Sequence, residues 1–105
     1  MGERRVVNSL DRLIVALCLD YKRRREIIEA RTASRRTDTE LRYYNFKLYD
    51  AVAEIVGERF AEGYIDEIGR NIGYAKSALY CFSEVTYKEY KRRAMDNIAK
   101  RLHLL

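Results

Sequence analysis

The fold class is decided by residues 37–56, which read TDTELRYYNFKLYDAVAEIV. Their large apolar side chains recur mostly three or four residues apart, which places them along one face of an α-helix. These side chains are Leu41, Tyr44, Leu48, Val52, Ile55 and Val56. At the start of the segment, Thr37 and Glu40 have the spacing of a capping box, in which each side chain accepts a hydrogen bond from a free amide of the first turn. The pattern predicts an amphipathic helix over 37–56.

The residues before this segment predict a second long helix that packs against it. Apolar side chains keep helical spacing from about residue 9 to residue 31, and either Asn8 or Ser9 can cap the start. A polar stretch over 32–37 separates the two predicted helices. We therefore expect a helical hairpin over 9–56.

The residues after this segment predict three further helices. Gly57 interrupts the pattern, and helical spacing then resumes over 58–69. We expect a short helix over 74–80. Ser83 is the predicted N-cap of a long last helix that reaches about Arg101.

Length and composition agree with a single all-α domain. The chain has 105 residues with no proline and only five glycines, so it lacks the frequent turn residues of β-sandwiches and barrels. Its 48% hydrophobic and 35% charged residues are typical of a folded domain rather than of a disordered chain. We expect residues 1–105 to form one small helical bundle, in which the portion over 58–105 has helix-turn-helix geometry at 74–101.

Positive charge is the clearest compositional hint of a partner. The chain has 21 Lys and Arg against 16 Asp and Glu, a net charge of +5, which favours polyanions such as nucleic acid. A secondary basic patch that contacts phosphates would consist of Arg23, Arg24, Arg35 and Arg36. The alternative interpretation is that these cations only solvate the ends of helices.

Catalytic and metal-binding patterns are not found in the sequence. It contains one histidine, His103, and no Gly-rich phosphate loop, HExxH or GxSxG motif. Cys18 and Cys81 are not part of a CxxC pair, so we expect free thiols in a reducing cytoplasm. The apolar run over 13–19 is far shorter than the ~20 residues of a membrane span. We therefore expect a cytoplasmic protein that is not an enzyme, with no cofactor, no metal site and no membrane partner.

The segment over 83–98, SEVTYKEYKRRAMDNI, carries the functional hypothesis. Ser83 is expected to cap a helix over this segment. The side chains of that helix expected to face the protein core are Tyr87, Tyr90, Ala94 and Ile98. The opposite face then carries Glu84, Val85, Lys88, Glu89, Lys91 and Arg92. A helix that exposes two turns with a positive side chain every three or four residues fits the major groove of DNA. A solvated amphipathic helix would have the same periodicity.

This segment resembles the recognition half of the helix-turn-helix in region 4 of bacterial sigma factors and in the related phage late-gene regulators of the ArpU and RinA type. The resemblance covers 73–102, and its matching features are the capping Ser83, the apolar Tyr87 and Tyr90, the basic pair Arg92-Arg93, the small Ala94 and the apolar Ile98. The chain departs from the family in having Cys81-Phe82 where a turn glycine is usual.

The resemblance implies sequence-specific binding of double-stranded DNA in transcription regulation, by a protein that a phage or another mobile element encodes. It implies that the base edges are contacted by Glu84, Val85, Lys88 and Arg92. It implies that the phosphates are contacted by Ser83, Lys91 and Arg93. A homodimer that reads two half-sites, with the helix over 9–31 as its interface, and a contact with RNA polymerase would accompany this function.

Two other functions stay open on the sequence. One is a small helical protein–protein interaction or oligomerisation module without nucleic-acid binding, in which the first helix pairs with another copy or with a partner. The other is RNA binding through the basic residues between Arg23 and Arg36. The hypotheses differ in location, because DNA binding should depend on Lys88 and Arg92, RNA binding on the earlier arginines, and an interaction module on neither.

Overall fold

The computed structural model describes residues 9–79 and 81–104, and these residues form α-helices and one short 3₁₀ turn, with no β-strand among them. The prediction of an all-α fold is confirmed. In chain order the elements are α1 (Ser9–Leu19), α2 (Tyr21–Ala30), α3 (Arg35–Val56), α4 (Glu58–Gly69), the 3₁₀ turn η1 (Tyr74–Lys76) and α5 (Glu84–Arg101). None of the helices within these two ranges is long and apolar enough to cross a membrane.

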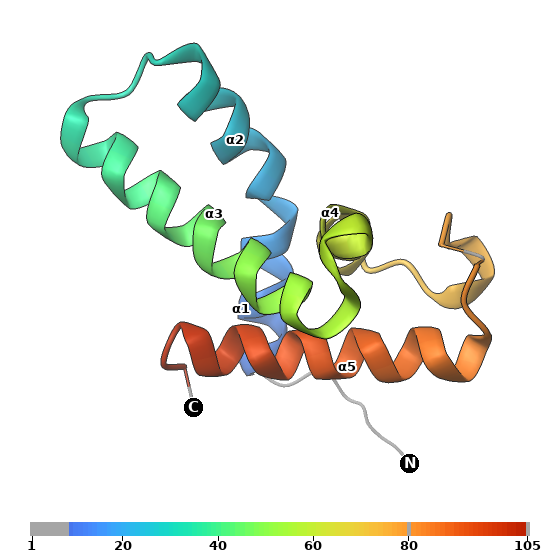
Figure 1. Ribbon diagram of the computed structural model, residues 1–105. Helices are drawn as coiled ribbons and strands as arrows, with labels where there is room; N and C mark the ends of the chain where they lie inside the picture. The colour runs from blue at the N-terminus through green and yellow to red at the C-terminus, as the bar shows by residue number, and fades with distance from the viewer. Residues whose placement is uncertain (1–8, 80, 105) are drawn as a thin grey trace.

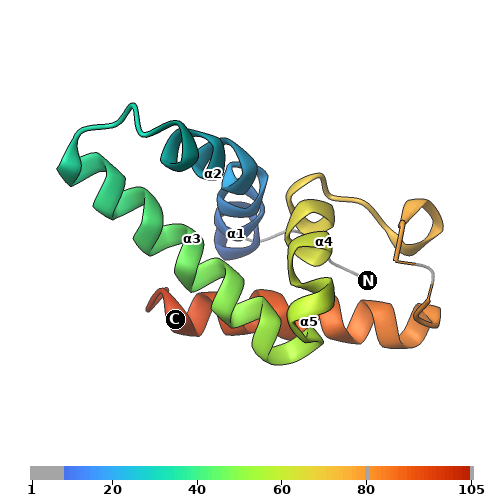
Figure 2. The ribbon, with the colours of Figure 1, turned by 45° about the horizontal axis from the view of Figure 1, so that its top comes forward.

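Helix α3 is the central element, and most of the other helices pack along it. Helix α2 runs antiparallel to the N-terminal half of α3 and forms with it an arm that leads away from α4 and α5 (Figure 1). Helices α4 and α5 pack against the C-terminal half of α3, while α1 lies against α4 and α5 (Figure 2). The described part of the chain measures 45 × 29 × 21 Å, so it is elongated.

The hydrophobic core forms where α1, α4, α5 and the C-terminal half of α3 meet. Its largest fully buried side chains are Tyr64, Tyr87, Ile14, Leu48, Ile65, Ile68, Ile98 and Val52. The predicted apolar face of 37–56 belongs to this core only in part, because Leu48 and Val52 are buried while Tyr44 is exposed. Tyr44 lies in the arm, where the buried side chain of α3 is instead Asn45.

The single helix predicted over 9–31 is broken at Asp20. Arg24 is only 4% exposed, and its Nη2 donates a 2.6 Å hydrogen bond to the carbonyl oxygen of Leu17. In an unbroken helix that carbonyl accepts from the amide of Tyr21, four residues later, so the arginine competes for its position in the ladder. A side chain inserted into the hydrogen-bond ladder is a common cause of a bend. The bend directs α1 toward α5 and α2 toward α3 (Figure 1).

Helix α3 begins before the predicted residue. Its N-cap is Ser34, whose Oγ accepts a 3.3 Å hydrogen bond from the amide of Thr37. The capping box predicted at Thr37 is therefore wrong, and Thr37 lies in the first turn of the helix. Ser34 provides the same chemistry three residues earlier, which extends the helix to Arg35.

The boundaries of α4 and α5 agree with the prediction. Gly57 separates α3 from α4 with a φ of +88°, a conformation that glycine adopts without a steric penalty. The Oγ of Ser83 accepts a 3.2 Å hydrogen bond from the amide of Thr86, which confirms the predicted cap of α5. Asn8, one of the two predicted caps of the first helix, lies outside the described residues.

The short helix predicted over 74–80 is reduced to the 3₁₀ turn η1. The reason is Glu67 on α4, whose carboxylate accepts hydrogen bonds from the Ser77 hydroxyl at 2.6 Å and from the Ala78 amide at 2.8 Å. These bonds satisfy polar groups that a helix would satisfy internally. The predicted end of the helix, Tyr80, lies outside the described residues. The first helix of the predicted helix-turn-helix is thus replaced by a turn.

Helices α1 and α4 touch through their backbones at Gly69. A Cβ atom at this position would lie 2.5 Å from the amide nitrogen of Leu19 and 2.7 Å from the carbonyl carbon of Cys18. Any side chain at Gly69 would therefore push the two helices apart. Gly73, four residues later, has nothing within 4 Å of the equivalent position.

We expect Gly69→Ala to destabilise the protein and Gly73→Ala to leave its stability nearly unchanged. Overpacking costs about 1–3 kcal/mol and sometimes more, whereas a surface substitution usually stays within about 0.5 kcal/mol. Urea unfolding followed by circular dichroism measures both. Equal midpoints for the two variants would contradict the close contact at Gly69.

Candidate functional site

A buried carboxylate on α4 fixes the segment that leads into α5. Glu67 is 3% exposed, and besides Ser77 and Ala78 it accepts a 2.7 Å hydrogen bond from the hydroxyl of Tyr87. A buried charge is costly unless it is hydrogen-bonded, so these donors hold the segment and α5 on α4. Burial and the hydrogen bond to Glu67 raise the pKa of Tyr87 to about 12, which keeps its hydroxyl a donor.

An aromatic cluster anchors the residue just before the cap of α5. The ring of Phe82 lies edge-on to three rings, with centroid distances of 4.8 Å to Phe60, 5.6 Å to Tyr90 and 5.8 Å to Tyr64. Such contacts contribute beyond the area they bury. Phe82 belongs to the Cys81-Phe82 pair that stands where the sigma-like family usually has a turn glycine. Its amide donates a 3.2 Å hydrogen bond to the Leu79 carbonyl, which closes a turn, and its ring packs against the core.

Six of the seven predicted DNA-contacting residues are exposed, and only Lys91 is half-buried. Four of the six, Glu84, Val85, Lys88 and Arg93, make no hydrogen bond or ion pair with another described helix. Val85 is 79% exposed, and the side chain of Lys88 is 64% exposed. Lys88 pairs with Glu84 at 2.7 Å, and the guanidinium of Arg93 lies 6.0 Å from the ring centroid of Tyr90. We call Glu84, Val85, Lys88 and Arg93 the outer face of α5.

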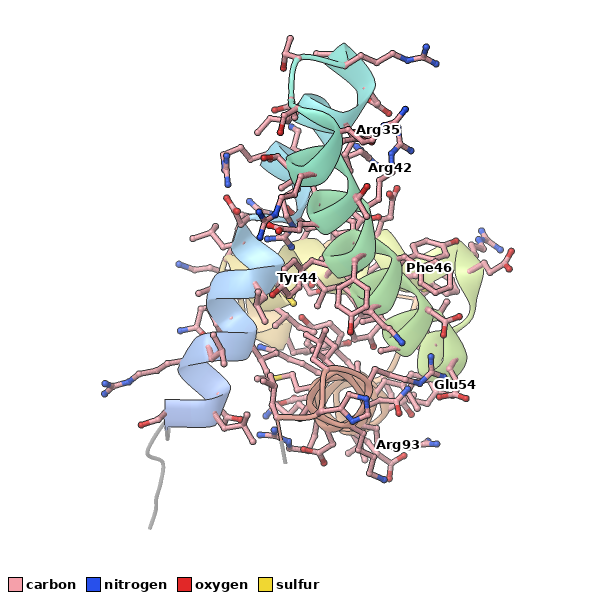
Figure 3. All side chains as sticks on the ribbon, turned by 90° about the vertical axis from the view of Figure 1, so that its left-hand side faces the viewer. Arg35, Arg42, Tyr44, Phe46, Glu54 and Arg93 are labelled. Atoms are coloured by element: carbon pink, nitrogen blue, oxygen red, sulfur yellow. The ribbon has the colours of Figure 1, made fainter. Side chains whose placement is uncertain are left out.

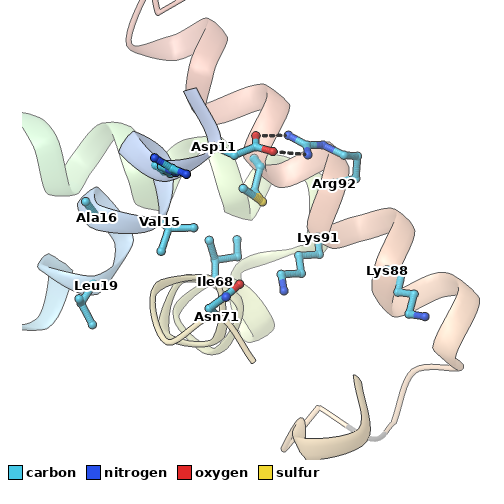
Figure 4. A pocket seen from close by; sticks show the side chains of 11 residues that line it. Asp11, Val15, Ala16, Leu19, Ile68, Asn71, Lys88, Lys91 and Arg92 are labelled. Atoms are coloured by element: carbon cyan, nitrogen blue, oxygen red, sulfur yellow. Dashed lines mark hydrogen bonds and ion pairs between the residues drawn. The ribbon is translucent and has the colours of Figure 1, made fainter. Parts of the chain in front are cut away.

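Arg92 links α5 to α1. Its Nη1 and Nη2 donate hydrogen bonds of 3.2 and 3.0 Å to the two carboxylate oxygens of Asp11 (Figure 4). Its Nη2 also donates a 3.0 Å hydrogen bond to Asp96. The Asp11 side chain is only 17% exposed, and a two-pronged pair of this kind is among the stronger charged contacts. The predicted base contact of Arg92 therefore competes with a link between two helices.

Ser83 and Lys91, two of the three predicted phosphate contacts, also have structural partners. The Ser83 side chain caps α5. The Nζ of Lys91 donates a 2.9 Å hydrogen bond to the carbonyl of Ile72, in the segment after α4. Burial lowers the pKa of Lys91, and the nearby charge of Glu67 opposes this effect.

The predicted secondary basic patch consists of Arg23, Arg24, Arg35 and Arg36. These arginines do not form one surface. The Nε of Arg24 donates a 2.6 Å hydrogen bond to the Asn45 side chain, and Arg24 is too buried to contact a phosphate. Arg23 makes hydrogen bonds of 2.5 and 2.6 Å to Asp20. Arg24 is held at Asn45, which lies ten residues along α3 from Arg35. At the rise of a helix this separation is about 15 Å, so Arg24 and Arg35 are not neighbours.

A different set of arginines meets at the tip of the arm. Arg31, Arg35 and Arg42 line a recess of about 540 Å³, together with Asp38. Arg42 pairs with Asp38 at 2.7 Å, whereas Arg31 and Arg35 form no ion pair with any described carboxylate. Arg35 and Arg42 lie near one end of the molecule and Arg93 near the other (Figure 3). The arm tip and the outer face of α5 are therefore separate surfaces.

A larger recess, of about 710 Å³, lies between α1, the end of α4 and α5 (Figure 4). We call it the interhelical recess. Its apolar lining residues are Val15, Ala16, Leu19, Ile68 and Met95. Its polar lining residues are Asp11, Arg12, Asn71, Lys88, Lys91 and Arg92. The recess depends on the bend at Asp20, so helical periodicity in the sequence does not reveal it. The one hint in the sequence is the apolar run over 13–19. Its last residue, Leu19, lies beside the recess with a side chain that is 62% exposed.

Residues 9–79 and 81–104 contain no group of three His, Cys, Asp or Glu that could hold a metal ion. Burial raises the pKa of Cys18 to about 12, so this thiol stays protonated and is a poor nucleophile. No family model, no curated protein and no solved structure matches the chain.

We expect Glu67→Gln to lower the free energy of unfolding by about 1–3 kcal/mol, because an amide offers one acceptor to three donors and leaves a buried group without a partner. The matched control is Glu58→Gln, which makes the same change at an exposed position of α4. Thermal unfolding of both variants checks the expectation. A Glu67→Gln variant as stable as the control would show that the carboxylate does not hold the segment before α5.

Proposed function

We propose that this protein binds double-stranded DNA through the outer face of α5 and acts in transcription regulation, as a product of a phage or another mobile element. The observation that supports the proposal is the combination of an exposed aliphatic residue and exposed cations on an uncovered helix start. Val85 is 79% exposed, Lys88 lies one turn after it, and the exposed Arg93 lies about 12 Å from Val85 along the helix.

These side chains match the chemistry of the major groove. A Val side chain can contact the methyl group of thymine, and Lys can donate to guanine or to a phosphate oxygen. The pair between Lys88 and Glu84 is more than half exposed on both sides, so it contributes only about 0–1 kcal/mol and can be exchanged for a contact with DNA. Arg93 has no carboxylate partner among the described residues.

The proposal assigns α5 the role of a recognition helix without a tight helix-turn-helix before it. In place of a preceding short helix, the start of α5 is positioned by the hydrogen bonds to Glu67 and by the aromatic contacts of Phe82. Arg92, Lys91 and Ser83 then keep the helix in place rather than read DNA. A homodimer, a contact with RNA polymerase and a cytoplasmic location stay predictions from the sequence.

The proposal is tested with the double variant Lys88→Gln, Arg93→Gln and a random duplex of about 30 base pairs, by fluorescence anisotropy at several salt concentrations. Each lost phosphate contact should reduce the slope of log K against log salt by about 0.9. We expect the variant to lose one or two such contacts. Its melting temperature should match that of the wild type, because neither side chain holds the core.

The matched control is Lys47→Gln, Lys100→Gln, which changes the net charge equally through cations outside the outer face. An equal loss of affinity in the two double variants would contradict a localised contact. If Arg31→Gln, Arg35→Gln abolishes binding while the α5 variant binds normally, the arm tip is the nucleic-acid surface instead. A folded wild type that does not bind at low salt would contradict the proposal and favour the protein-interaction alternative.

A further inference from the structure

The interhelical recess has two helical walls, α1 and α5, which diverge from the contact between Asp11 and Arg92 (Figure 4). Along α1 its lining runs from Asp11 to Leu19, nine residues with a rise of about 12 Å, and along α5 from Lys88 to Met95, eight residues with a rise of about 10 Å. The end of α4 supplies Ile68 between them. This length corresponds to about two turns of a helix.

The apolar part of the recess includes a side chain that the fold leaves unused. Ile68 and Met95 are nearly buried at its base, whereas Leu19 is among the most exposed large apolar residues of the described chain. Val15 and Ala16 continue the apolar strip one turn before Leu19. An apolar strip along one helical wall is typical of grooves that bind an amphipathic helix.

The charged rim of the recess is strongly positive. It carries Arg12, Lys88, Lys91 and Arg92, while its only carboxylate, Asp11, already binds Arg92. Arg12 and Lys91 form no ion pair with a described carboxylate. The Lys91 side chain extends into the recess with one acceptor, the Ile72 carbonyl, for its three donors (Figure 4).

We propose that the interhelical recess binds an acidic amphipathic helix of a partner protein. Apolar side chains of that helix would cover Leu19 and Val15, and its Glu or Asp residues would accept hydrogen bonds from Lys91 and Arg12. The duplex fits this recess less well, because its phosphate backbone offers no apolar surface to Leu19. The recess shares Lys88 with the outer face of α5, so the proposal is tested at Leu19, Lys91 and Arg12, which belong to the recess and not to the outer face.

The probe is a fluorescein-labelled model peptide of about 16 residues, since helices shorter than ~12–15 residues are marginal in water. It carries Leu at helical spacing on one face and Glu on both flanks. A second peptide has Gln in place of every Glu. Anisotropy titration with the full chain should show that the Glu peptide binds at least about tenfold more tightly than the Gln peptide, because hydrogen bonds to charged groups are the stronger ones.

The variant that tests the apolar part is Leu19→Gln, and its matched control is Val85→Gln, the same kind of change at an exposed site outside the recess. We expect Leu19→Gln to weaken binding of the Glu peptide by about tenfold, as loss of a buried Leu contact implies. Val85→Gln should leave peptide binding unchanged. In the duplex assay we expect the reverse: Val85→Gln weakens DNA binding and Leu19→Gln leaves it unchanged. Failure of this proposal and failure of the DNA-binding proposal are therefore distinguishable.

The charge requirement is tested with Lys91→Met, which keeps the length of the side chain and removes the ammonium. We expect this variant to lose most of the preference for the Glu peptide over the Gln peptide. If Lys91→Met does not fold, Arg12→Gln tests the same requirement at an exposed position. Equal affinity of wild type for both peptides, or no binding of either, would overturn the proposal. It would also be overturned if the chain forms a dimer in sedimentation velocity that Leu19→Gln dissociates, because the occupant is then a second copy.

Discussion

The arrangement of the helices depends on the burial of one guanidinium, that of Arg24. It donates to the Leu17 carbonyl, to the Asn45 side chain and to Asp20, and Asn45 in turn donates to the Tyr21 carbonyl. Burial lowers the pKa of Arg24 while the charge of Asp20 opposes this effect, so the cation is compensated by polar groups from three elements. The bend that results places α1 beside α5 instead of continuing along α3. The contact at Gly69, the Asp11–Arg92 link and the interhelical recess all follow from that placement.

The sequence was sufficient for elements whose signals are local. Gly57 and Ser83 mark boundaries within a few residues of the helices that they end or begin, and α4 and α5 were predicted with those bounds. The error at Thr37 is also local, because Ser34 offers an equivalent cap one turn earlier. The break at Asp20 and the loss of the helix over 74–80 were not predictable in this way. Each depends on a side chain whose partners the periodic pattern does not reveal: Arg24, which donates to Leu17 and Asn45, and Glu67, which accepts from Ser77 and Ala78.

The same distinction applies to the candidate site. Helical periodicity correctly placed Tyr87, Ala94 and Ile98 in the core and therefore Val85 and Lys88 at the surface. It could not show that Arg92 binds Asp11, because the two residues are 81 positions apart in the chain. The inward position of Lys91 likewise depends on where the Ile72 carbonyl lies after α4 has ended. Exposure can be read from a periodic pattern, whereas the partner of an exposed-looking charge requires the fold.

The cations of α5 divide into those that the fold uses and those that it leaves at the surface. Arg92 joins α1, and Arg101 pairs with Asp50 and Glu54 on α3. Lys88, Arg93 and Lys100 remain at the surface. Lys91 belongs to both groups, because it donates to the Ile72 carbonyl and also points into the interhelical recess (Figure 4). A basic residue already committed to an internal carboxylate must break that contact before it can bind another anion, whereas an uncommitted one does not. The two proposed binding surfaces therefore rely on Lys88, Lys91 and Arg93. Each surface also contains an exposed apolar side chain that is not part of the core, Val85 on α5 and Leu19 on α1.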